Sequence, residues 1–464
     1  MINAGDTAWV LASSALVLLM TPGLAFFYGG MVRAKTVLNM LMMNFICLAI
    51  VGVLWILYGY SLAFGPDAKG GLIGNLSHIG MKSTIDQNAF PGAAATPDTL
   101  TNGQLVPGTP GHQIPLLALV MFQLMFAIIT PALISGSIAD RAKFWSWGIF
   151  VALWSTFVYF PVAHWVFDFA NTDPAGGGGG WIANKLLAYD FAGGTAVHIN
   201  AGAAGLALAI VLGRRAGWPK EKMRPHNVPF VLLGASLLWF GWFGFNAGSS
   251  LKADSIAANA FTTTMVATAA GVLGWLVVEQ FRDGKPTTVG AASGAVAGLV
   301  AITPACAYVN ALGGIAIGVA AGVLCALAVS LKYRFGFDDS LDVVGVHFVG
   351  GWIGTVMTGL FCTTTGGAAL KNGLFMGGGF DQLWRQFVAA GSVSVYSFTL
   401  ALIFGFAIKW TIGFRVSDED EATGVDTAEH AESGYELGAL AGVGSTYRPV
   451  GAAVPSVTNE AVDA

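Results

Sequence analysis

Charged side chains are scarce in this chain of 464 residues. Asp, Glu, Lys and Arg make up 10% of it and hydrophobic residues 55%, whereas roughly 25% of a soluble globular protein is charged. The mean hydropathy is +0.67. Residues 8–28, 39–64 and 145–167 lack the continuous polar face of a soluble amphipathic helix. These absences exclude a water-soluble fold, because apolar stretches of about 18 residues or more indicate transmembrane helices.

Cysteine is also sparse, and its four occurrences form no motif. Cys47, Cys306, Cys325 and Cys362 lie in or next to apolar segments. Their spacing fits neither a zinc site nor a disulfide framework, so we interpret them as small buried hydrophobic residues. Basic residues are missing before the first apolar segment. We therefore expect no cleavable signal peptide, and a short N-terminal tail that leads directly into the first helix.

The apolar segments themselves predict an all-α integral membrane protein. Windows of about 20 residues give eleven transmembrane helices, at residues 8–31, 37–64, 114–139, 144–167, 194–212, 228–249, 258–280, 288–303, 311–331, 342–362 and 386–409. We accordingly expect a transmembrane domain over residues 1–412 and an acidic tail over residues 413–464.

Basic residues gather in alternate loops, which predicts the orientation in the membrane. Cytoplasmic loops carry the excess of Lys and Arg. The opposite loops have only Lys69, Lys82, Lys185, Lys252, Lys371 and Arg385. The basic loops carry Arg33, Lys35, Arg141, Lys143, Arg214, Arg215, Lys220, Lys222, Arg224, Arg282, Lys285, Lys332 and Arg334, and the last helix ends beside Lys409 and Arg415. The N-terminus is thus predicted outside and the C-terminus inside, in a multi-pass protein of the cytoplasmic (inner) membrane.

Two long connections are predicted on the outer side. Residues 65–113 are rich in Gly, Pro, Thr and Asn, and residues 173–185 contain five consecutive glycines. A phosphate-binding glycine loop lies between a strand and a helix. Neither segment has that context, so both are interpreted as flexible surface connections.

One pattern occurs twice. Asp190 precedes His198 by eight positions in DFAGGTAVH, and Asp339 precedes His347 by eight positions in DSLDVVGVH. Five predicted helices separate the two copies, so the copies enter the membrane from opposite sides. This arrangement predicts an inverted repeat of five helices plus one extra helix, with a site near the middle of the membrane.

His198 and His347 are unusual because each lies inside an apolar segment. Ionisable side chains at such depth normally face the protein interior or a permeation pathway. A pair of hydrogen-bonded core histidines is the simple alternative, and two histidines on different helices also suit bis-histidine haem ligation. No further His, Cys or carboxylate joins them in a pattern that predicts a metal site. By contrast, His164 near the outer end of the fourth helix needs no special explanation.

The acidic residues of the repeat have two possible roles. Asp190 lies at the start of a helix, where a carboxylate accepts hydrogen bonds from free backbone N–H groups. It could equally supply a negative field to a cation that arrives from outside. Asp338, Asp339 and Asp342 are expected to cap a helix and order a loop on the cytoplasmic side.

Aromatic residues recur on two helical faces. Phe122 and Phe126 are four residues apart, with Gln123 beside them. The sixth segment places Trp242, Phe245 and Ser249 on a common face, in WFGWFGFNAGSS. Such faces usually serve helix packing. Here the face ends in polar residues, as cation–π recognition of a small ammonium-like ion requires.

These segments together resemble the Amt/Mep/Rh family of ammonium transporters, in its bacterial Amt form. The resemblance rests on four ordered motifs: PGLAFFYGGMVRAKTVLNML at residues 22–41, DFAGGTAVHINAGAAGL from Asp190, GWFGFNAGS from Gly241 and DDSLDVVGVHFVGG from Asp338. It extends to GFRVSDEDE at Gly413. It implies a homotrimer of eleven-helix subunits, each with its own pore, and a transporter rather than an enzyme, without a cofactor.

The resemblance also implies roles for particular residues. Phe126 and Phe245 match the stacked pair that closes the external vestibule, Ser249 matches the vestibule hydroxyl, and Trp242 lies near this gate. Phe167 stands where the family has a vestibule tryptophan, with Trp165 as the nearest indole.

Deeper residues of the family motifs match as well. His198 and His347 match the twin histidines of a hydrophobic pore, and Asp190 matches an acidic residue essential near the recruitment site. NH₄⁺ is accordingly expected to bind in the vestibule, to lose a proton, and to pass the histidines as NH₃.

The end of the chain is predicted to be an acidic tail. By composition, Asp418 to Glu421 begin a solvated end of the chain. The family resemblance instead implies that the early tail packs on the cytoplasmic face, where a PII-type signalling protein can bind.

No nucleic-acid partner is expected. An ammonium sensor, a Rhesus-like gas channel and a haem-bearing electron-transfer protein are the alternatives.

Overall fold

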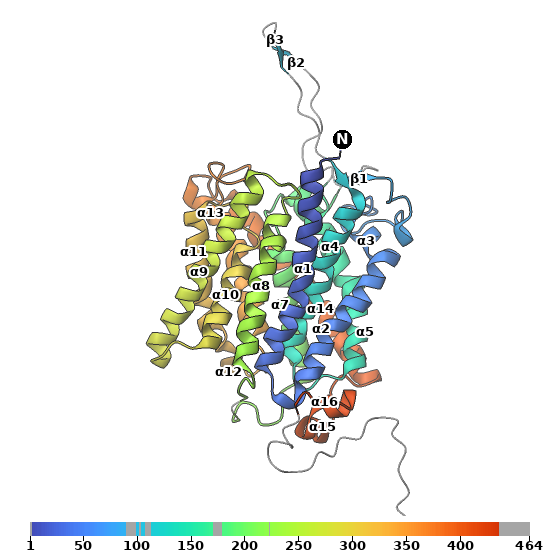
Figure 1. Ribbon diagram of the computed structural model, residues 1–464, viewed down its shortest axis with the longest axis vertical. Coiled ribbons are helices and arrows are strands. Elements are labelled where there is room, and N and C mark those ends of the chain that lie inside the picture. Colours follow the sequence, from blue (N-terminus) through green and yellow to red (C-terminus); the bar gives the residue numbers. More distant parts are fainter. Residues whose placement is uncertain are drawn as a thin grey trace, which may run out of the picture.

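The computed structural model is a bundle of long, roughly parallel helices. It describes residues 2–89, 99–101, 104–106, 113–169, 179–221 and 223–435. The N-terminus lies at the top of Figure 1, and the last two helices lie at the opposite end of the bundle. We call these ends the N-terminal face and the C-terminal face. Opposite placement of the N-terminus and the last two helices agrees with an odd number of membrane crossings.

Helices dominate the described residues. The α-helices are α1 (Ala4–Met31), α2 (Val37–Leu54), α3 (Tyr60–Phe64), α4 (Leu116–Ile134), α5 (Phe144–Trp154), α6 (Phe160–Phe167), α7 (Asn200–Leu212), α8 (Val228–Gly248), α9 (Ser255–Asp283), α10 (Thr288–Ile302), α11 (Ala311–Ala328), α12 (Leu331–Phe335), α13 (Val349–Phe361), α14 (Asp381–Thr411), α15 (Asp418–Thr423) and α16 (Val425–His430).

Short irregular helices and four short strands complete the structure. The π-helical segments are η2 (Trp55–Gly59), η5 (Ser155–Tyr159), η6 (Ile182–Leu186), η7 (Gly194–Ile199) and η8 (Val344–Phe348). The 3₁₀ turns are η1 (Ala34–Thr36), η3 (Ile79–Met81), η4 (Ser135–Ile138) and η9 (Leu374–Met376). The strands β1 (Asn88–Ala89) and β4 (Ile114–Pro115) pair antiparallel, as do β2 (Thr99–Thr101) and β3 (Gln104–Val106).

The predicted transmembrane helices are confirmed. Ten helical stretches of the described residues are long and apolar enough to cross a membrane. The eleventh, predicted at residues 288–303, is the shorter apolar helix α10 of 15 residues. The largest boundary difference lies in the last helix, which begins at Asp381 instead of residue 386. Polar residues there continue the helix beyond its apolar part, so a hydropathy window misses them.

Glycines allow the closest helix contacts. A Cβ atom on Gly234 of α8 would lie 2.2 Å from the backbone N of Phe27 in α1. A Cβ atom on Gly318 of α11 would lie 2.1 Å from the carbonyl oxygen of Ala267 in α9. In a membrane, close backbone approach replaces the hydrophobic driving force between helices. The abundance of glycine in the sequence therefore has a direct packing role.

The two Asp–His motifs adopt the same local structure. Asp190 Oδ2 accepts a hydrogen bond from the N–H of Thr195 at 2.8 Å, and Asp339 Oδ2 accepts one from the N–H of Val344 at 2.7 Å. Each aspartate thus caps a π-helical segment five residues further on. His198 lies in η7 and His347 in η8. This repeated local structure matches the predicted repeat, and the expected capping role of Asp339 is confirmed.

The cysteines and the loop before η8 agree with the predictions. All four cysteines are free and buried, as expected. Asp338 and Asp342 form ion pairs with Arg215 and Lys332, at 2.9 and 2.6 Å, and so order the loop before η8. Residues 90–98, 102–103, 107–112 and 173–178 of the two glycine-rich connections lie outside the described residues, and the predicted flexibility of both connections stays a prediction.

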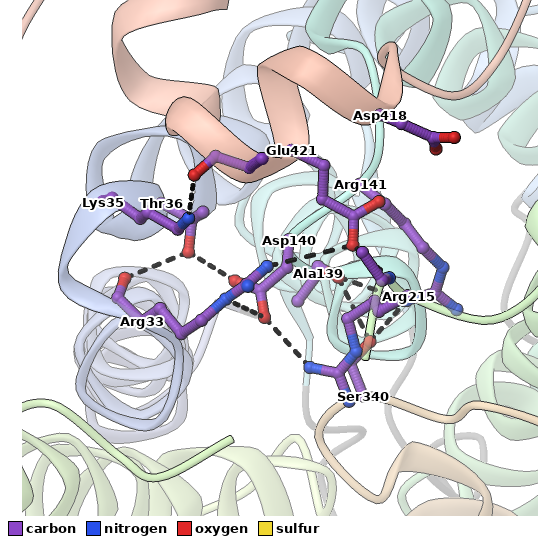
Figure 2. Close-up of polar contacts among 12 residues, drawn as sticks. Arg33, Lys35, Thr36, Ala139, Asp140, Arg141, Arg215, Ser340, Asp418 and Glu421 are labelled. Carbon is purple, nitrogen blue, oxygen red and sulfur yellow. Dashed lines mark hydrogen bonds and ion pairs between the residues drawn. The ribbon is translucent and has the colours of Figure 1, made fainter. Parts of the chain in front are cut away.

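The beginning of the tail is docked on the C-terminal face. Glu421 of α15 has no exposed side-chain surface, and its carboxylate accepts hydrogen bonds from Arg415 Nη2 at 2.6 Å and from the N–H of Ala216 at 2.7 Å. Figure 2 shows this carboxylate above a buried ion-pair network that contains Arg33, Asp140 and Arg215. The composition-based prediction of a solvated end is therefore wrong for Glu421, whereas Asp418 and Glu419 are exposed as predicted.

Two more acidic residues of the tail cap transmembrane helices. Asp426 of α16 accepts hydrogen bonds from the N–H groups of Leu38 and Asn39, at 3.0 and 2.7 Å, at the start of α2. Glu429 accepts one from the N–H of Phe144 at 2.9 Å, at the start of α5. Negative charge at a helix N-terminus is stabilising. The boundary between residues 412 and 413 stays a prediction, because the docked tail and the bundle share these contacts.

Candidate permeation site

Two small cavities lie one beyond the other between the helices. The first, which we call the upper cavity, has a volume of about 40 Å³. It lies toward the N-terminal face and is lined by Phe64, Leu119, Gln123, Phe126, Phe167, Phe169, Phe191, Ser249 and Leu251. One water molecule needs about 10–15 Å³ by this measure. The upper cavity therefore has room for a few small molecules of the size of water or ammonium.

The structure brings three predicted site residues into the upper cavity. Phe126, Phe167 and Ser249 all contribute to its wall. The rings of Phe126 and Phe167 meet edge to face at a centroid distance of 6.1 Å. Ser249 Oγ donates a hydrogen bond to the carbonyl oxygen of Phe245 at 2.7 Å, and the oxygen lone pairs can still accept a hydrogen bond from a guest.

The Phe126 and Phe245 rings close the bottom of the upper cavity. Their centroids lie 4.3 Å apart with planes at 32°, and both residues are buried. Phe245 also lines the second, lower cavity. Phe126 lines the upper cavity and Phe245 the lower one, so the ring pair lies between the two cavities.

The lower cavity contains the two histidines in an otherwise apolar wall. Its volume is about 10 Å³, and it is lined by Met20, Leu24, Ile129, Leu133, Val197, His198, Leu238, Trp242, Phe245, Val296 and His347. This is about the space of a single water molecule. The imidazoles are the only side chains on this described wall, apart from the Trp242 indole, that carry hydrogen-bonding nitrogen.

His198 and His347 are in direct contact. Their Nδ1 atoms are 3.4 Å apart, and their rings lie nearly parallel at 23°. Only one of the two facing nitrogens can carry the hydrogen between them, so one ring donates and the other accepts. The Nε2 atom of His198 is buried and has no partner among the described residues, which leaves it able to bond a passing molecule.

Trp242 holds His198 in place from the other side. The indole and imidazole rings stack at 5.4 Å and 19°. The indole Nε1 donates a hydrogen bond to Thr303 Oγ1 at 2.9 Å, which fixes the orientation of the indole. Trp242 therefore lines the lower cavity rather than the upper one, and Thr303 is a supporting residue that the sequence patterns did not indicate.

The Asp190 carboxylate accepts hydrogen bonds from the backbone that follows it. Its carboxylate accepts hydrogen bonds from the N–H groups of Gly193, Gly194 and Thr195, at 2.7 to 2.8 Å, and from the hydroxyl of Thr195. It does not belong to the wall of either cavity. Of its two possible roles, the geometry supports capping of η7.

The geometry also bears on the haem and metal alternatives. The histidine nitrogens already face each other at 3.4 Å, and about 10 Å³ of space cannot hold a porphyrin. Within the described part of the chain, no three His, Cys, Asp or Glu residues gather in a way that could hold a metal ion.

Sequence reasoning missed part of the upper cavity. Phe64 comes from a segment without a site motif, Phe191 lies within the Asp190–His198 motif but was given no role, and Gln123 had been noted without a role. Phe64 ends α3 and Phe191 follows Asp190, so both belong to helix ends. Hydropathy treats such positions as boundaries, and only the packing of distant helices reveals them as walls.

A family model described as "Ammonium Transporter Family" matches residues 8–435. The chain belongs to the ammonium transporter family. Its relatives include an ammonium transporter of Mycobacterium bovis, which is 60% identical over 95% of this chain and 92% of its own length. An ammonium transporter of Bacillus subtilis is 43% identical over 93% of this chain and 98% of its own length.

Solved structures of this family share the fold. Mep2 of Candida albicans matches with a TM-score of 0.78 and 31% identity, over 90% of this chain and 88% of its own. A structure titled "Sensor Amt Protein" matches with a TM-score of 0.79 and 26% identity, over 92% of this chain and 98% of its own. This family member is therefore a multi-pass membrane protein with the helical architecture of Amt and Mep proteins.

Proposed function

We propose that this protein takes up ammonium across the cytoplasmic membrane, by binding NH₄⁺ in the upper cavity and passing NH₃ through the lower one. The observation that carries the proposal is the order of the two sites. An aromatic cavity with a serine hydroxyl leads through a closed ring pair to an apolar cavity with two imidazoles. We further propose that the N-terminal face is external, as the distribution of basic residues predicts.

The upper cavity suits a small cation. Aromatic faces attract cations through the ring quadrupole, by about 0.5–2 kcal/mol for each ring depending on desolvation. Five phenylalanine rings line this cavity, and Ser249 and Gln123 offer oxygen acceptors to N–H donors. These contacts replace part of the hydration shell that the ion loses on entry.

The lower cavity suits a neutral molecule. An unpaired charge in apolar surroundings is strongly disfavoured, and no described acidic residue lines this cavity. Ammonium solves the problem by leaving its proton behind, because NH₃ can donate to and accept from the imidazoles. K⁺ has no proton to release, so the same barrier excludes it.

Electrical recording tests this function. Purified protein on a supported membrane receives a pulse of ammonium chloride or an equal pulse of potassium chloride. We expect a response to ammonium alone, seen as current or, for neutral conduction, as alkalinisation reported by a pH-sensitive dye inside vesicles. Equal responses to both salts, or neither signal with ammonium, contradict the proposal.

Substitution of the histidines tests the role of the lower cavity. We expect His198→Ala combined with His347→Ala to abolish selective ammonium transport, because the cavity then has no group that bonds to NH₃. His78→Gln changes a buried histidine of an outer loop and serves as the control. Unimpaired and still selective transport by the double variant rules out the proposed role of the pair.

The assembly and partner predictions belong to the same proposal. We expect a homotrimer, which native mass spectrometry of the detergent-solubilised protein can establish. A PII-type signalling protein is expected to bind the C-terminal face, which carries the docked tail. Co-purification with and without residues 417–464 tests that contact.

A sensor is the second candidate function, because one solved structure of similar fold is titled a sensor. The discriminating experiment is growth of transport-deficient cells on low ammonium. Rescue by this chain supports transport, whereas ammonium binding without rescue supports a sensor.

A further inference from the structure

His164 lies at the outer end of α6 and has no exposed surface. Three oxygen atoms surround its ring. Nδ1 is 3.0 Å from the carbonyl oxygen of Ala63 and 3.4 Å from Oδ2 of Asp168, and Nε2 is 3.4 Å from Oδ1 of Asp67. A carbonyl and a carboxylate oxygen can only accept hydrogen bonds. Both ring nitrogens therefore face acceptors.

This environment distinguishes between the two protonation states of the ring. A neutral imidazole has one N–H group, so one of its nitrogens would direct a lone pair at a carboxylate or carbonyl oxygen. The imidazolium form has two N–H groups and a positive charge, and it satisfies both sides at once. Closure of this contact is thus coupled to binding of one proton.

The charged groups around the ring favour its protonated form and oppose the effect of burial, which favours the neutral form. Burial tends to raise the pKa of Asp67, but the N–H groups of Gly71 and Lys69 together with His164 outweigh it, so the pKa lies below its ordinary value. Asp67 is accordingly a carboxylate. Asp168 faces the ring from the end of α6, and Lys185 of η6 donates instead to the carbonyl oxygen of Gly70. Two negative charges therefore face one imidazole.

The same contacts touch the wall of the upper cavity. Ala63 precedes Phe64, and Asp168 follows Phe167; both phenylalanines line the cavity. His164 joins the outer ends of α3 and α6, which carry these two rings. A change in this joint shifts the rings relative to each other, and cation–π attraction depends on their position.

We propose that His164, Asp67 and Asp168 form a proton-dependent clamp, which sets the affinity of the upper cavity for ammonium according to the pH at the outer face. The clamp rests on the proposed function of the upper cavity. In acid, the imidazolium holds α3 against α6 and the aromatic wall is closed around the cation. In base, the neutral ring keeps only one N–H group and releases one of its two acceptors. The aromatic wall of the upper cavity then loosens.

Apparent KM measured against external pH tests the clamp. Currents are recorded at fixed NH₄⁺ concentrations between about pH 5 and pH 8, where imidazole ordinarily titrates. We expect the wild-type KM to rise about fivefold toward the alkaline end, equivalent to about 1 kcal/mol. His164→Gln should show a flat profile, and His78→Gln should follow the wild type. A His164→Gln variant that retains the wild-type profile overturns the proposal.

Asp67→Asn provides a second, milder variant. Its amide oxygen can still accept from Gly71 and Lys69, so the loop is kept, but one negative charge beside the ring is lost. The imidazolium is then less favoured, and the KM transition should move to lower pH. An unmoved transition contradicts the clamp, because the charge of Asp67 would then have no influence on His164.

Nitrogen NMR of the ring separates failure of the clamp from failure of the proposed function. In ¹⁵N-histidine protein, the His164 signals are assigned by their loss in His164→Gln. If His164→Gln does not fold, they are assigned by their shift in Asp67→Asn. We expect a change from imidazolium to neutral imidazole within the same pH range as the KM transition. A ring that stays neutral throughout overturns the clamp. Absence of any wild-type ammonium response instead overturns the proposed function.

Discussion

Phe167 occupies the position at which the family resemblance implies a tryptophan. Its ring lines the upper cavity and meets Phe126 edge to face. An indole attracts a cation more strongly than a phenyl ring does. The cavity of this protein is therefore expected to bind ammonium less tightly than an indole-bearing wall would allow.

Phe167→Trp tests this expectation. The variant should lower the apparent KM for ammonium about two- to fivefold, because one stronger cation–π contact contributes about 0.5–1 kcal/mol. KM is obtained from the currents, and Phe157→Trp, whose side chain is half exposed on the bundle surface, is the control. A higher KM in a variant of unchanged thermal stability would show that the volume of the upper cavity, and not the cation–π contact, decides the affinity for ammonium.

Asp339 is a buried carboxyl group outside the transmembrane helices. Burial and the nearby Asp342 carboxylate, opposed by Lys332, raise its pKa to about 6. The folded pKa thus lies above that of the unfolded chain, near 4. The stability that this group contributes is present below pH 4 and is lost as the pH rises through 6.

Asp339→Asn should therefore stabilise the protein at neutral pH. The amide oxygen can still accept from the N–H of Val344, and no buried charge remains. We expect Tm at pH 7.5 to rise by about 2–5 °C, from about 1–3 kcal/mol of relieved desolvation. The difference should vanish near pH 4, where the wild-type group is protonated. Thermal unfolding in detergent measures both values, and a lower Tm at neutral pH would contradict the argument.

At the scale of secondary structure, the repeated feature is a capped π-helical segment that presents a histidine. The π-helical turn is rare and often marks a functional position. The two caps differ in strength. Asp190 accepts from three backbone N–H groups at 2.8 Å or less and from a hydroxyl, whereas Asp339 accepts from one backbone N–H. The His198 segment is therefore held by more hydrogen bonds than the His347 segment.

Asp190 variants separate capping from recruitment of the cation. Asp190→Ala leaves several buried N–H groups without an acceptor, at about 1–3 kcal/mol each, and should fold poorly. Asp190→Asn retains one oxygen, so its Tm and transport rate should both fall to intermediate values. Thermal unfolding and ammonium currents are measured on the same samples. An Asp190→Asn variant with wild-type Tm and no transport would instead assign the charge a direct role in recruitment.

Much of the secondary structure and the pairing of the two histidines could be predicted from the sequence. Apolar runs gave the transmembrane helices within about five residues, and the depth and spacing of His198 and His347 led to their pairing. The clamp could not be predicted, because His164 meets Ala63 and Asp67 about a hundred positions away in the sequence. Hydropathy records whether a residue is buried, but not which distant polar groups it meets.

At the scale of the whole molecule, the docked tail connects segments that are far apart in the sequence. Glu421 binds the loop after α7, Asp426 binds the start of α2, and Glu429 binds the start of α5. The ion pairs below Glu421 are buried, and arginine side chains hold the pKa of Asp140 below its ordinary value despite that burial (Figure 2). The acidic composition of the tail matches this basic face, although composition alone suggested solvation.

Glu421→Gln tests the connection. The neutral amide leaves Arg415 without its buried counter-charge, whereas Arg33 keeps Asp140. Loss of one partner from a buried ion pair is strongly destabilising. We expect faster hydrogen–deuterium exchange in residues 33–39, 141–144 and 214–221, measured by mass spectrometry. Glu419→Gln changes an exposed carboxylate of the same helix and should leave exchange unchanged. Equal protection in both variants would show that the tail is held by its other contacts.

The contact between the two imidazoles has a consequence for the direction of flow. One hydrogen lies between the two Nδ1 nitrogens, so it can belong to either ring, and the donor and acceptor roles can be exchanged. Binding at the pair supplies no free energy that would drive passage inward rather than outward. The pair by itself would not rectify the flow of NH₃, and net movement would follow the concentration and proton gradients that the cell maintains across the membrane.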